Sequence, residues 1–245
     1  MSSTHPVRRV VAGAAALALI AAACGSDGSG SDTGSDSESD AASAFQVVTT
    51  VAPITSIAAN VIGDCAEITG IVPEGTNSHT FEPPPSAAEL MSAADVVFIN
   101  GLQLEEPTKA LAEANVADGV RIVELGDLTV SPEQYKYDFS FPEDGSKPNP
   151  HLWTDPTLVK VYAEIIRDTM VAEVPECTDQ LNANYDQFVI LVDEFDAAIR
   201  EAFDTIPEDQ RKLVTYHDAY AYFADTYGWN VIGAVQPADF GDPTP

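Results

Sequence analysis

The chain has 245 residues, of which 11 are Lys or Arg and 39 are Asp or Glu, so its formal charge at pH 7 is −28. This charge excludes nucleic-acid binding through a phosphate-neutralising patch, which requires clustered basic side chains. A strongly acidic surface keeps a protein soluble and attracts cations only weakly and nonspecifically.

The first 23 residues have the pattern of a secretory signal peptide. Arg8 and Arg9 precede an apolar run that is too short and too rich in alanine for a membrane span. Cys24 follows three small residues, which resembles a lipoprotein signal-peptidase site, although Ala21 stands where the pattern usually has a larger aliphatic residue. We predict cleavage before Cys24 and lipidation of its thiol, with plain secretion and an unpaired Cys24 as the alternative.

Cleavage would remove two arginines and no acidic residue, which changes the formal charge from −28 to −30, and His5 would be lost with them. Residues 24–44 hold almost no apolar side chain and are predicted to form a flexible Ser/Gly/Asp tether. We therefore expect an extracytoplasmic protein held by its lipid at the outer face of the cytoplasmic membrane. About 200 residues remain, enough for one large domain or two small lobes.

From residue 45 the chain alternates between apolar runs and helical segments. The expected strands cover 46–51, 66–72, 95–101 and 121–125, and the expected helices cover 55–62, 86–94 and 107–115. Ser86 and Glu89 have the spacing of a capping box. The alternation predicts an α/β fold with a four-stranded, mostly parallel sheet.

Residues 127–150 show little periodicity and are predicted to form a surface loop that leads to His151. A helix should follow, with Asp155 as its N-cap, Pro156 at its first position and its end near Val174. The apolar residues then step by three or four over 181–203, which predicts a long helix that joins two lobes. Strands at 212–216 and 229–235 and a helix at 218–227 complete the pattern.

The expected division of the chain has three folded parts. They are an N-terminal α/β lobe over 45–177, a linking helix over 178–206 and the start of a C-terminal α/β lobe over 207–245. The last ten residues have the composition of a loop, so we expect this second lobe to be incomplete in the sequence.

Two cysteines remain after Cys24, and an isolated pair in an exported protein favours a disulfide over a metal site. Cys65 precedes a strand whose far end leads to His79. Cys177 follows a helix whose near end adjoins His151. Both cysteines should therefore lie at the end of the lobe opposite the histidines, and we predict a Cys65–Cys177 disulfide.

Three histidines each occupy a polar turn near the end of a predicted element. His79 and His217 follow strands, and His151 precedes a helix. A single histidine is more often a structural residue than a ligand, but ligands in open α/β sheets collect outside the carboxyl ends of strands, so three together suggest one metal site. Carboxylates close in sequence could accept from the second ring nitrogens. These are Glu82, Asp155 and Asp218.

The motifs around these histidines are His-Thr-Phe-Glu-Pro, Asn-Pro-His-Leu-Trp-Thr-Asp-Pro and Tyr-His-Asp-Ala-Tyr-Ala-Tyr-Phe-Ala-Asp-Thr-Tyr-Gly. Over residues 45–240 they resemble the zinc and manganese solute-binding lipoproteins of ABC importers, the ZnuA and TroA type. The resemblance implies two lobes joined by a rigid helix, a metal in the cleft between them, and a monomer that delivers it to a membrane permease. It implies His79, His151 and His217 as the ligands.

The chain departs from this family's pattern in two places. The family usually takes an acidic fourth ligand from a loop far along the second lobe, which this sequence ends before reaching. We expect either that the sequence is a fragment and this ligand lies beyond its end, or that water or a local acid such as Asp239 fills the position. The loop before His151 is also histidine-rich in many zinc-specific members, whereas here it holds acids, tyrosines and prolines.

Zinc is the expected ligand, because three nitrogens and one oxygen suit a tetrahedral ion, whereas manganese prefers more oxygen. A Mn²⁺ or Fe²⁺ carrier of the same family is the first alternative. A secreted zinc hydrolase is the second, but the chain has no His-Glu-x-x-His motif and no glutamate placed as a general base. A surface interaction protein with a structural metal is the third. We therefore expect a carrier and not an enzyme.

Overall fold

The computed structural model describes residues 44–145, 147–236 and 240. The signal peptide, Cys24, most of the tether and Asp239 lie outside these residues. The predicted four-stranded sheet is confirmed, and its strands are all parallel in the order β2-β1-β3-β4. They are β1 (Gln46–Thr49), β2 (Glu67–Gly70), β3 (Val96–Ile99) and β4 (Arg121–Glu124).

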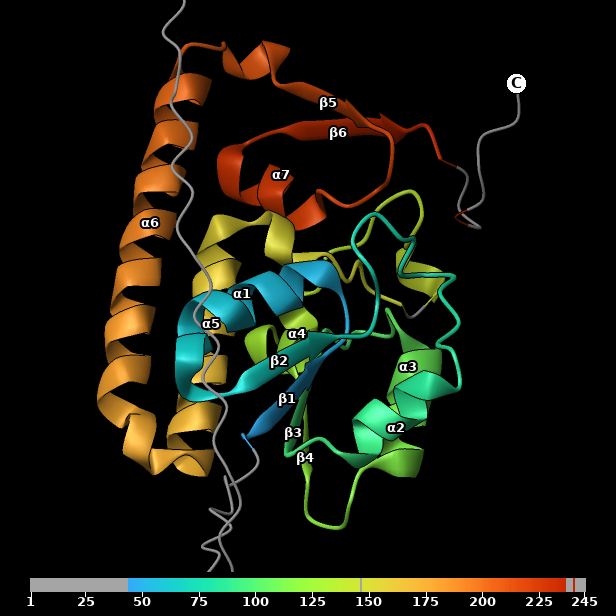
Figure 1. Cartoon of the computed structure of the whole chain (residues 1–245). Coiled ribbons are helices and arrows are strands. Elements are labelled where there is room, and N and C mark those ends of the chain that lie inside the picture. The colour runs from blue at the N-terminus through green and yellow to red at the C-terminus, as the bar shows by residue number, and fades with distance from the viewer. Residues whose placement is uncertain (1–43, 146, 237–239, 241–245) are drawn as a thin grey trace, which may run out of the picture. The chain divides into compact units, whose positions relative to one another are not determined.

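Helices cover both faces of this sheet (Figure 1). One face carries α1 (Ala52–Ile62), α5 (Pro156–Glu173) and α6 (Thr178–Asp204), and the other carries α2 (Ser86–Ser92) and α3 (Glu106–Asn115). The central strand β3 shows why, because all four of its side chains are buried. Val96 and Phe98 belong to the core under α1 and α5, and Val97 and Ile99 belong to the core under α2. A strand apolar on both sides needs cover on both sides.

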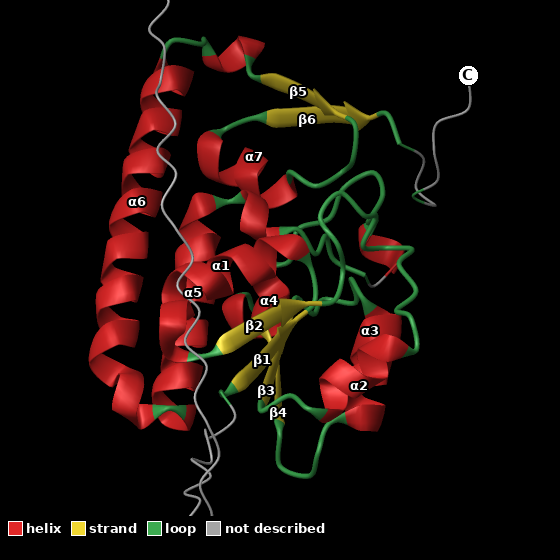
Figure 2. Cartoon of the chain, in the orientation of Figure 1, coloured by secondary structure: helices red, strands yellow, loops and turns green. Residues whose placement is uncertain are grey.

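The linking helix α6 has 27 residues and runs past the first sheet to a second, two-stranded sheet (Figure 2). It packs along α5 and α1. The second sheet pairs β5 (Lys212–Thr215) with β6 (Asn230–Ala234) in parallel, and α7 (Ala221–Tyr227) connects them. The ring of Phe203, near the end of α6, lies 4.9 Å from that of Trp229, so the helix end is tied to the second sheet.

Two local expectations differ from the structure. Ser86 makes no capping bond, because Pro85 before it is already helical (φ −55°, ψ −29°) and places Ser86 inside the first turn. A short helix, α4 (Leu125–Thr129), begins directly after β4 and takes in the last residue of the expected strand and the start of the expected loop. The predicted N-cap is confirmed: the Asp155 side chain accepts from the backbone N–H of Thr157.

Among the described residues, no helix combines the length and the apolar composition that a bilayer span requires.

A disulfide joins Cys65 and Cys177, whose Cα atoms are 6.0 Å apart. Cys65 ends a 3₁₀ turn after α1, and Cys177 ends another between α5 and α6. The bond therefore fastens the start of the linking helix to the first lobe. It links residues 112 positions apart, so it greatly restricts the unfolded chain.

Replacing Cys65 and Cys177 together by Ala should lower the free energy of unfolding by about 2–4 kcal/mol, because the unfolded chain regains its freedom. Chemical denaturation of the mature domain measures this loss. Metal affinity should stay the same, because the bond lies at the end of α5 away from the histidines. An unchanged denaturation midpoint would show that the cross-link adds nothing to stability.

Candidate metal centre

The structure brings the three predicted histidines together from three separate loops. His79 lies in the loop after β2, His151 directly before the turn that leads into α5, and His217 two residues after β5. Their Nε2 atoms form a nearly equilateral triangle. The separations are 3.0 Å between His79 and His151, 3.1 Å between His79 and His217, and 2.9 Å between His151 and His217.

The orientation of the His151 ring is fixed by Asn149. The ring Nδ1 lies 2.7 Å from Oδ1 of Asn149, an atom that can only accept. The amide is held this way round because its Nδ2 donates to a carboxylate oxygen of Asp138 and to the backbone carbonyl of Asp218, 2.9 Å away. His151 therefore carries its proton on Nδ1 and presents the Nε2 lone pair to the centre.

The same arrangement holds His217. Its Nδ1 lies 2.6 Å from Oε1 of Gln236, and the Nε2 of Gln236 donates to the backbone carbonyl of Phe240 at 2.8 Å. His217 therefore also carries its proton on Nδ1, and its unprotonated Nε2 points to the centre of the triangle. Phe240 in turn stacks on the His79 ring, with centroids 4.0 Å apart and planes 9° apart.

These tautomers leave two lone pairs facing each other at 2.9 Å, a pair that cannot form a hydrogen bond. A proton on Nε2 of His79 could satisfy only one of them at a time. A cation at the centre satisfies all three rings at once, since neutral imidazole is a common metal ligand. The arrangement of the three Nε2 atoms therefore favours the binding of a cation.

Burial keeps the rings of His79 and His151 neutral. It lowers the pKa of His79 to about 3, helped by the nearby His217 and Lys147. It also lowers the pKa of the fully enclosed His151 well below its ordinary value, with His79 and His217 adding to the effect. Metal ligation requires the unprotonated ring, so these two rings stay available to a metal in mildly acidic solution.

The three carboxylates predicted to support the rings do not hold the Nδ1 atoms of His151 and His217. Asp155 caps α5 and accepts from the hydroxyl of Thr226. Asp218 accepts from the backbone N–H of Ser140 at 2.8 Å, and Glu82 is exposed. The prediction that these carboxylates accept from the ring nitrogens is wrong for Nδ1 of His151 and His217. The neutral amides of Asn149 and Gln236 bond these two atoms instead.

The sequence did carry a sign of one of these amides. Asn77 and Asn149 each stand two residues before a histidine, and each Oδ1 accepts from that histidine's backbone N–H, at 3.1 and 3.0 Å. Asn commonly bonds to the backbone two residues on. The repeated Asn-x-His spacing would therefore have pointed to Asn149. Gln236 lies 19 positions from His217, and no local pattern indicates it.

A second buried network holds the segment before His151. Tyr162 donates to Oδ1 of Asn100 at 2.8 Å, and Nδ2 of Asn100 donates to the carbonyl of Pro150 at 2.9 Å. The backbone N–H of Asn100 donates to Glu105 at 2.6 Å. Burial raises the pKa of Glu105 to about 7, although bonds from Thr50 and Asn100 act in the opposite direction. A partly protonated buried carboxyl thus lies behind the loop that carries His151.

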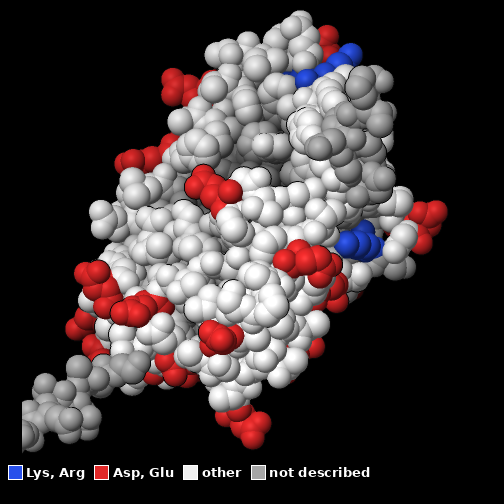
Figure 3. Space-filling view, turned by 45° about the vertical axis from the view of Figure 1, so that its right-hand side comes forward, with Lys and Arg blue, Asp and Glu red and all other residues white. Residues whose placement is uncertain are grey.

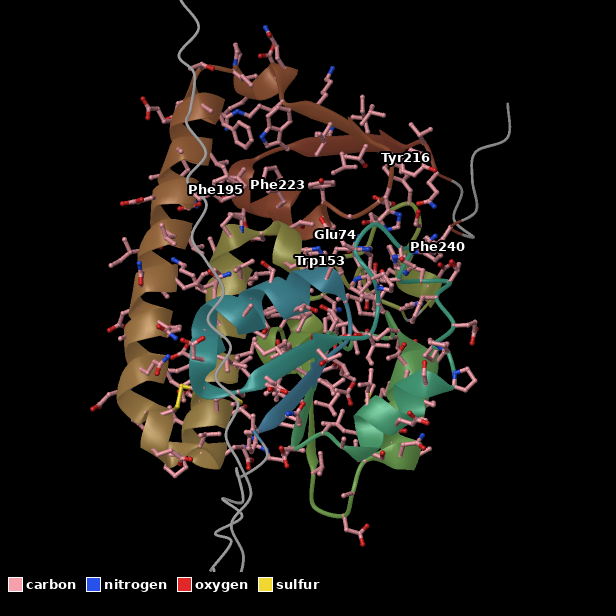
Figure 4. All side chains as sticks on the ribbon, viewed as in Figure 1. Glu74, Trp153, Phe195, Tyr216, Phe223 and Phe240 are labelled. Carbon is pink, nitrogen blue, oxygen red and sulfur yellow. A yellow bond between two sulfur atoms is a disulfide. The ribbon has the colours of Figure 1, made fainter. Side chains whose placement is uncertain are left out.

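A cavity of about 990 Å³ opens beside the three histidines. Its walls come from the loops of the first lobe, from the end of α6 and from the second sheet with α7. Figure 4 shows Trp153 from the His151 loop and Phe223 from α7 near this space. In Figure 3 a hollow opens in the upper part of the face turned to the viewer.

The comparisons with known proteins agree with this geometry. Residues 47–245 match the family model described as zinc-uptake complex component A, periplasmic. The chain belongs to this family. The chain is 34% identical to the manganese-binding lipoprotein MntA of Halalkalibacterium halodurans, in an alignment that covers 94% of this chain and 71% of MntA. It is 32% identical to the iron-binding protein YfeA of Yersinia pestis, over 79% of this chain and 60% of YfeA.

Solved structures support the fold. A crystal structure of ZnuA superposes with a TM-score of 0.69 at 23% identity and covers 82% of this chain and 73% of that one. A cadmium-bound periplasmic metal binding protein from Candidatus Liberibacter asiaticus also gives 0.69, over 77% and 68%. The chain thus spans roughly 60–70% of the length of the relatives named here. The family match and the two curated relatives, which are named as metal-binding, support the expectation of a binding protein rather than an enzyme.

Replacing Asn149 by Ala should weaken metal binding about 10–100-fold, because His151 loses the acceptor that sets its tautomer. Metal titration of the purified variant measures this effect. Asn60→Ala on α1 is the matched control, since that exposed amide bonds only to the carbonyl of Ser56 in its own helix. Equal affinities for the two variants would contradict the role given to Asn149.

Glu105 predicts a specific dependence of stability on pH. Its folded pKa of about 7 exceeds the ordinary 4.5, so the folded state holds the extra proton between these values and stability falls as pH rises through that window. Relative to Glu105→Gln, the protein should lose up to about 3 kcal/mol of unfolding free energy from pH 4.5 to pH 7. Denaturant unfolding of both proteins across this range measures the difference in their unfolding free energies. Both proteins contain the same histidines, so the contribution of histidine titration cancels in this difference.

Glu194→Gln, at an exposed position on α6, is the control for this comparison. Parallel pH profiles for the wild-type protein and Glu105→Gln would show that Glu105 ionises normally.

Proposed function

We propose that this protein captures a divalent transition metal outside the cytoplasmic membrane and delivers it to an ABC permease, with Zn²⁺ as its preferred ion. The observation that carries the proposal is the convergence of three Nε2 atoms within 3.1 Å of one another. Two of them are held unprotonated by amide oxygens. His79, His151 and His217 are the proposed ligands.

The donor set favours zinc over manganese. Three imidazole nitrogens with one further ligand suit a tetrahedral ion, and nitrogen sites bind Zn²⁺ more tightly than Mn²⁺ or Fe²⁺. Tetrahedral zinc at about 2.0–2.1 Å from each nitrogen would separate the nitrogens by roughly 3.3 Å. The rings need to move apart by only a few tenths of an ångström to receive it.

Manganese and iron remain the alternatives within the same function, since the relatives named above are described as manganese-binding and iron-binding. Other relatives are metal ABC transporter substrate-binding lipoproteins, such as FimA of Streptococcus parasanguinis. Their names support delivery to a permease and a lipid anchor, here through Cys24. We propose that the anchored carrier is a monomer.

In a competitive calorimetric titration, the protein should bind one Zn²⁺ ion and prefer it to Mn²⁺ by about tenfold or more. His151→Ala should weaken zinc binding more than about a hundredfold, because one of three ligands is lost. Asn60→Ala again serves as the control. Preference for Mn²⁺ would assign the chain to the manganese alternative, and zinc binding that His151→Ala leaves intact would reject the site.

Removal of the metal by a chelator should leave the fold intact, because the cores of the first lobe do not include the three histidines. Circular dichroism should be unchanged, while the melting temperature should rise again on adding metal. At a free metal concentration of one hundred times Kd, the gain is about 2.7 kcal/mol. Unfolding on chelation would instead indicate a structural metal.

A further inference from the structure

Glu105 lies in the interior of the first lobe, where only 3% of its surface is exposed. Its Oε1 accepts from the hydroxyl of Thr50 and from the backbone N–H of Asn100, both at 2.6 Å. Its Oε2 is buried and has no hydrogen-bond partner among the described residues, and no Lys or Arg of that part of the chain forms an ion pair with it. A buried carboxylate without a cation is costly, so burial favours the neutral acid and raises the pKa of Glu105 to about 7.

The other titratable groups around this carboxyl have partners or stay neutral. Tyr162 faces it from α5, and burial raises the pKa of that phenol well above its ordinary value. Asp127 on α4 accepts from a backbone N–H of the loop before Glu105 at 2.8 Å, and Glu124 on β4 pairs with Lys109 on α3 at 2.7 Å. The neighbouring α1, β1 and β3 carry no titratable side chain. Glu105 is therefore the group of this described network that changes its charge near neutral pH.

A short path of hydrogen bonds joins Glu105 to the segment that carries a metal ligand. Asn100 donates from its backbone to Glu105, and its Nδ2 donates to the carbonyl of Pro150 at 2.9 Å. Pro150 directly precedes His151, which is itself only 2% exposed. Little water lies along this path, so a charge on Glu105 and an ion at the histidines would interact more strongly than two surface charges do. All four residues belong to the first lobe.

The backbone between Asn100 and Glu105 is strained. Gly101, Leu102 and Gln103 have φ angles of 77°, 52° and 59°, in the left-handed region that leucine and glutamine rarely adopt. Strain of this kind persists only where the surrounding structure imposes it, and it is concentrated at functional sites. It marks this loop as more than a connection between β3 and α3.

We propose that Glu105 couples metal binding to proton release: its buried carboxyl gives its proton to the solvent when a divalent cation binds at the three histidines. The ionised carboxylate attracts the cation through the protein interior and accepts a stronger hydrogen bond from Asn100, which holds Pro150 beside His151. By reciprocity, protonation of Glu105 in acid weakens metal binding. Glu105 does not touch the metal, so it is a positioning residue. The inference rests on the proposed function.

The test compares zinc affinity across pH for the full mature protein and for Glu105→Gln, measured against a competing chelator. The metal-free carboxyl titrates at about 7, and a bound cation moves that titration to lower pH. Relative to Glu105→Gln, zinc affinity of the wild-type protein should therefore rise about five- to tenfold from pH 5.5 to pH 8, within the usual range of coupling between two ligands. Both proteins contain the same histidines, so their titration cancels in this comparison.

Proton release gives a second readout that a purely structural role would not change. Calorimetry at pH 6.5 in two buffers with different heats of ionisation counts the protons released for each zinc bound. The wild-type protein should release about half a proton more than Glu105→Gln, as expected for a tenfold coupling.

Glu106→Gln, at the exposed neighbouring position, is the matched control and should keep the wild-type profile. Thr50→Val removes a donor that favours the ionised carboxylate, so it should move the rise in affinity to higher pH. Parallel profiles and equal proton release for the wild-type protein and Glu105→Gln, or an unshifted profile for Thr50→Val, would overturn the inference and leave the carrier function standing. A Glu106→Gln profile that matches Glu105→Gln would also overturn it. Absence of zinc binding to the wild-type protein at every pH would overturn both.

Discussion

The site depends on one electrostatic constraint: two imidazole lone pairs are made to face each other. The amide oxygens of Asn149 and Gln236 each accept a hydrogen bond from the Nδ1–H of a histidine. The Nε2 atoms of His151 and His217 therefore lie 2.9 Å apart without a hydrogen between them. Two lone pairs held this close repel each other, and a cation between the rings would remove the repulsion. The fold holds this arrangement in place through contacts that lie behind the rings.

Those contacts come from the two lobes in different ways. The first lobe is a parallel sheet buried on both faces, and the Asn100 network fixes the carbonyl beside His151. The second lobe is smaller, and it contributes His217 from the end of β5 and Gln236 from just after β6. Asn149 bridges them, because its amide bonds both His151 and the carbonyl of Asp218. Relative movement of the lobes would therefore alter ring orientation and metal affinity together.

Local patterns in the sequence were enough to predict most of the fold. The buried run of β3 and the three-to-four periodicity of α6 are set by which side chains must leave water, and that information is local. The three histidines could be found because each stands at the end of an element in an α/β fold. Their partners could not be found in the same way. A side chain such as Gln236 becomes a partner only through the folded path of the chain, and the nearby acids Asp155 and Asp218 are bound to other groups.

The most direct test of this account is nitrogen-15 NMR of the histidine rings in the metal-free protein at neutral pH, with His151→Ala used to assign the signals. The account predicts that His151 and His217 are neutral and carry their proton on Nδ1, and that added zinc shifts the Nε2 resonances of His79, His151 and His217. A proton on Nε2 of His151 or His217, or a positively charged ring at neutral pH, would contradict it.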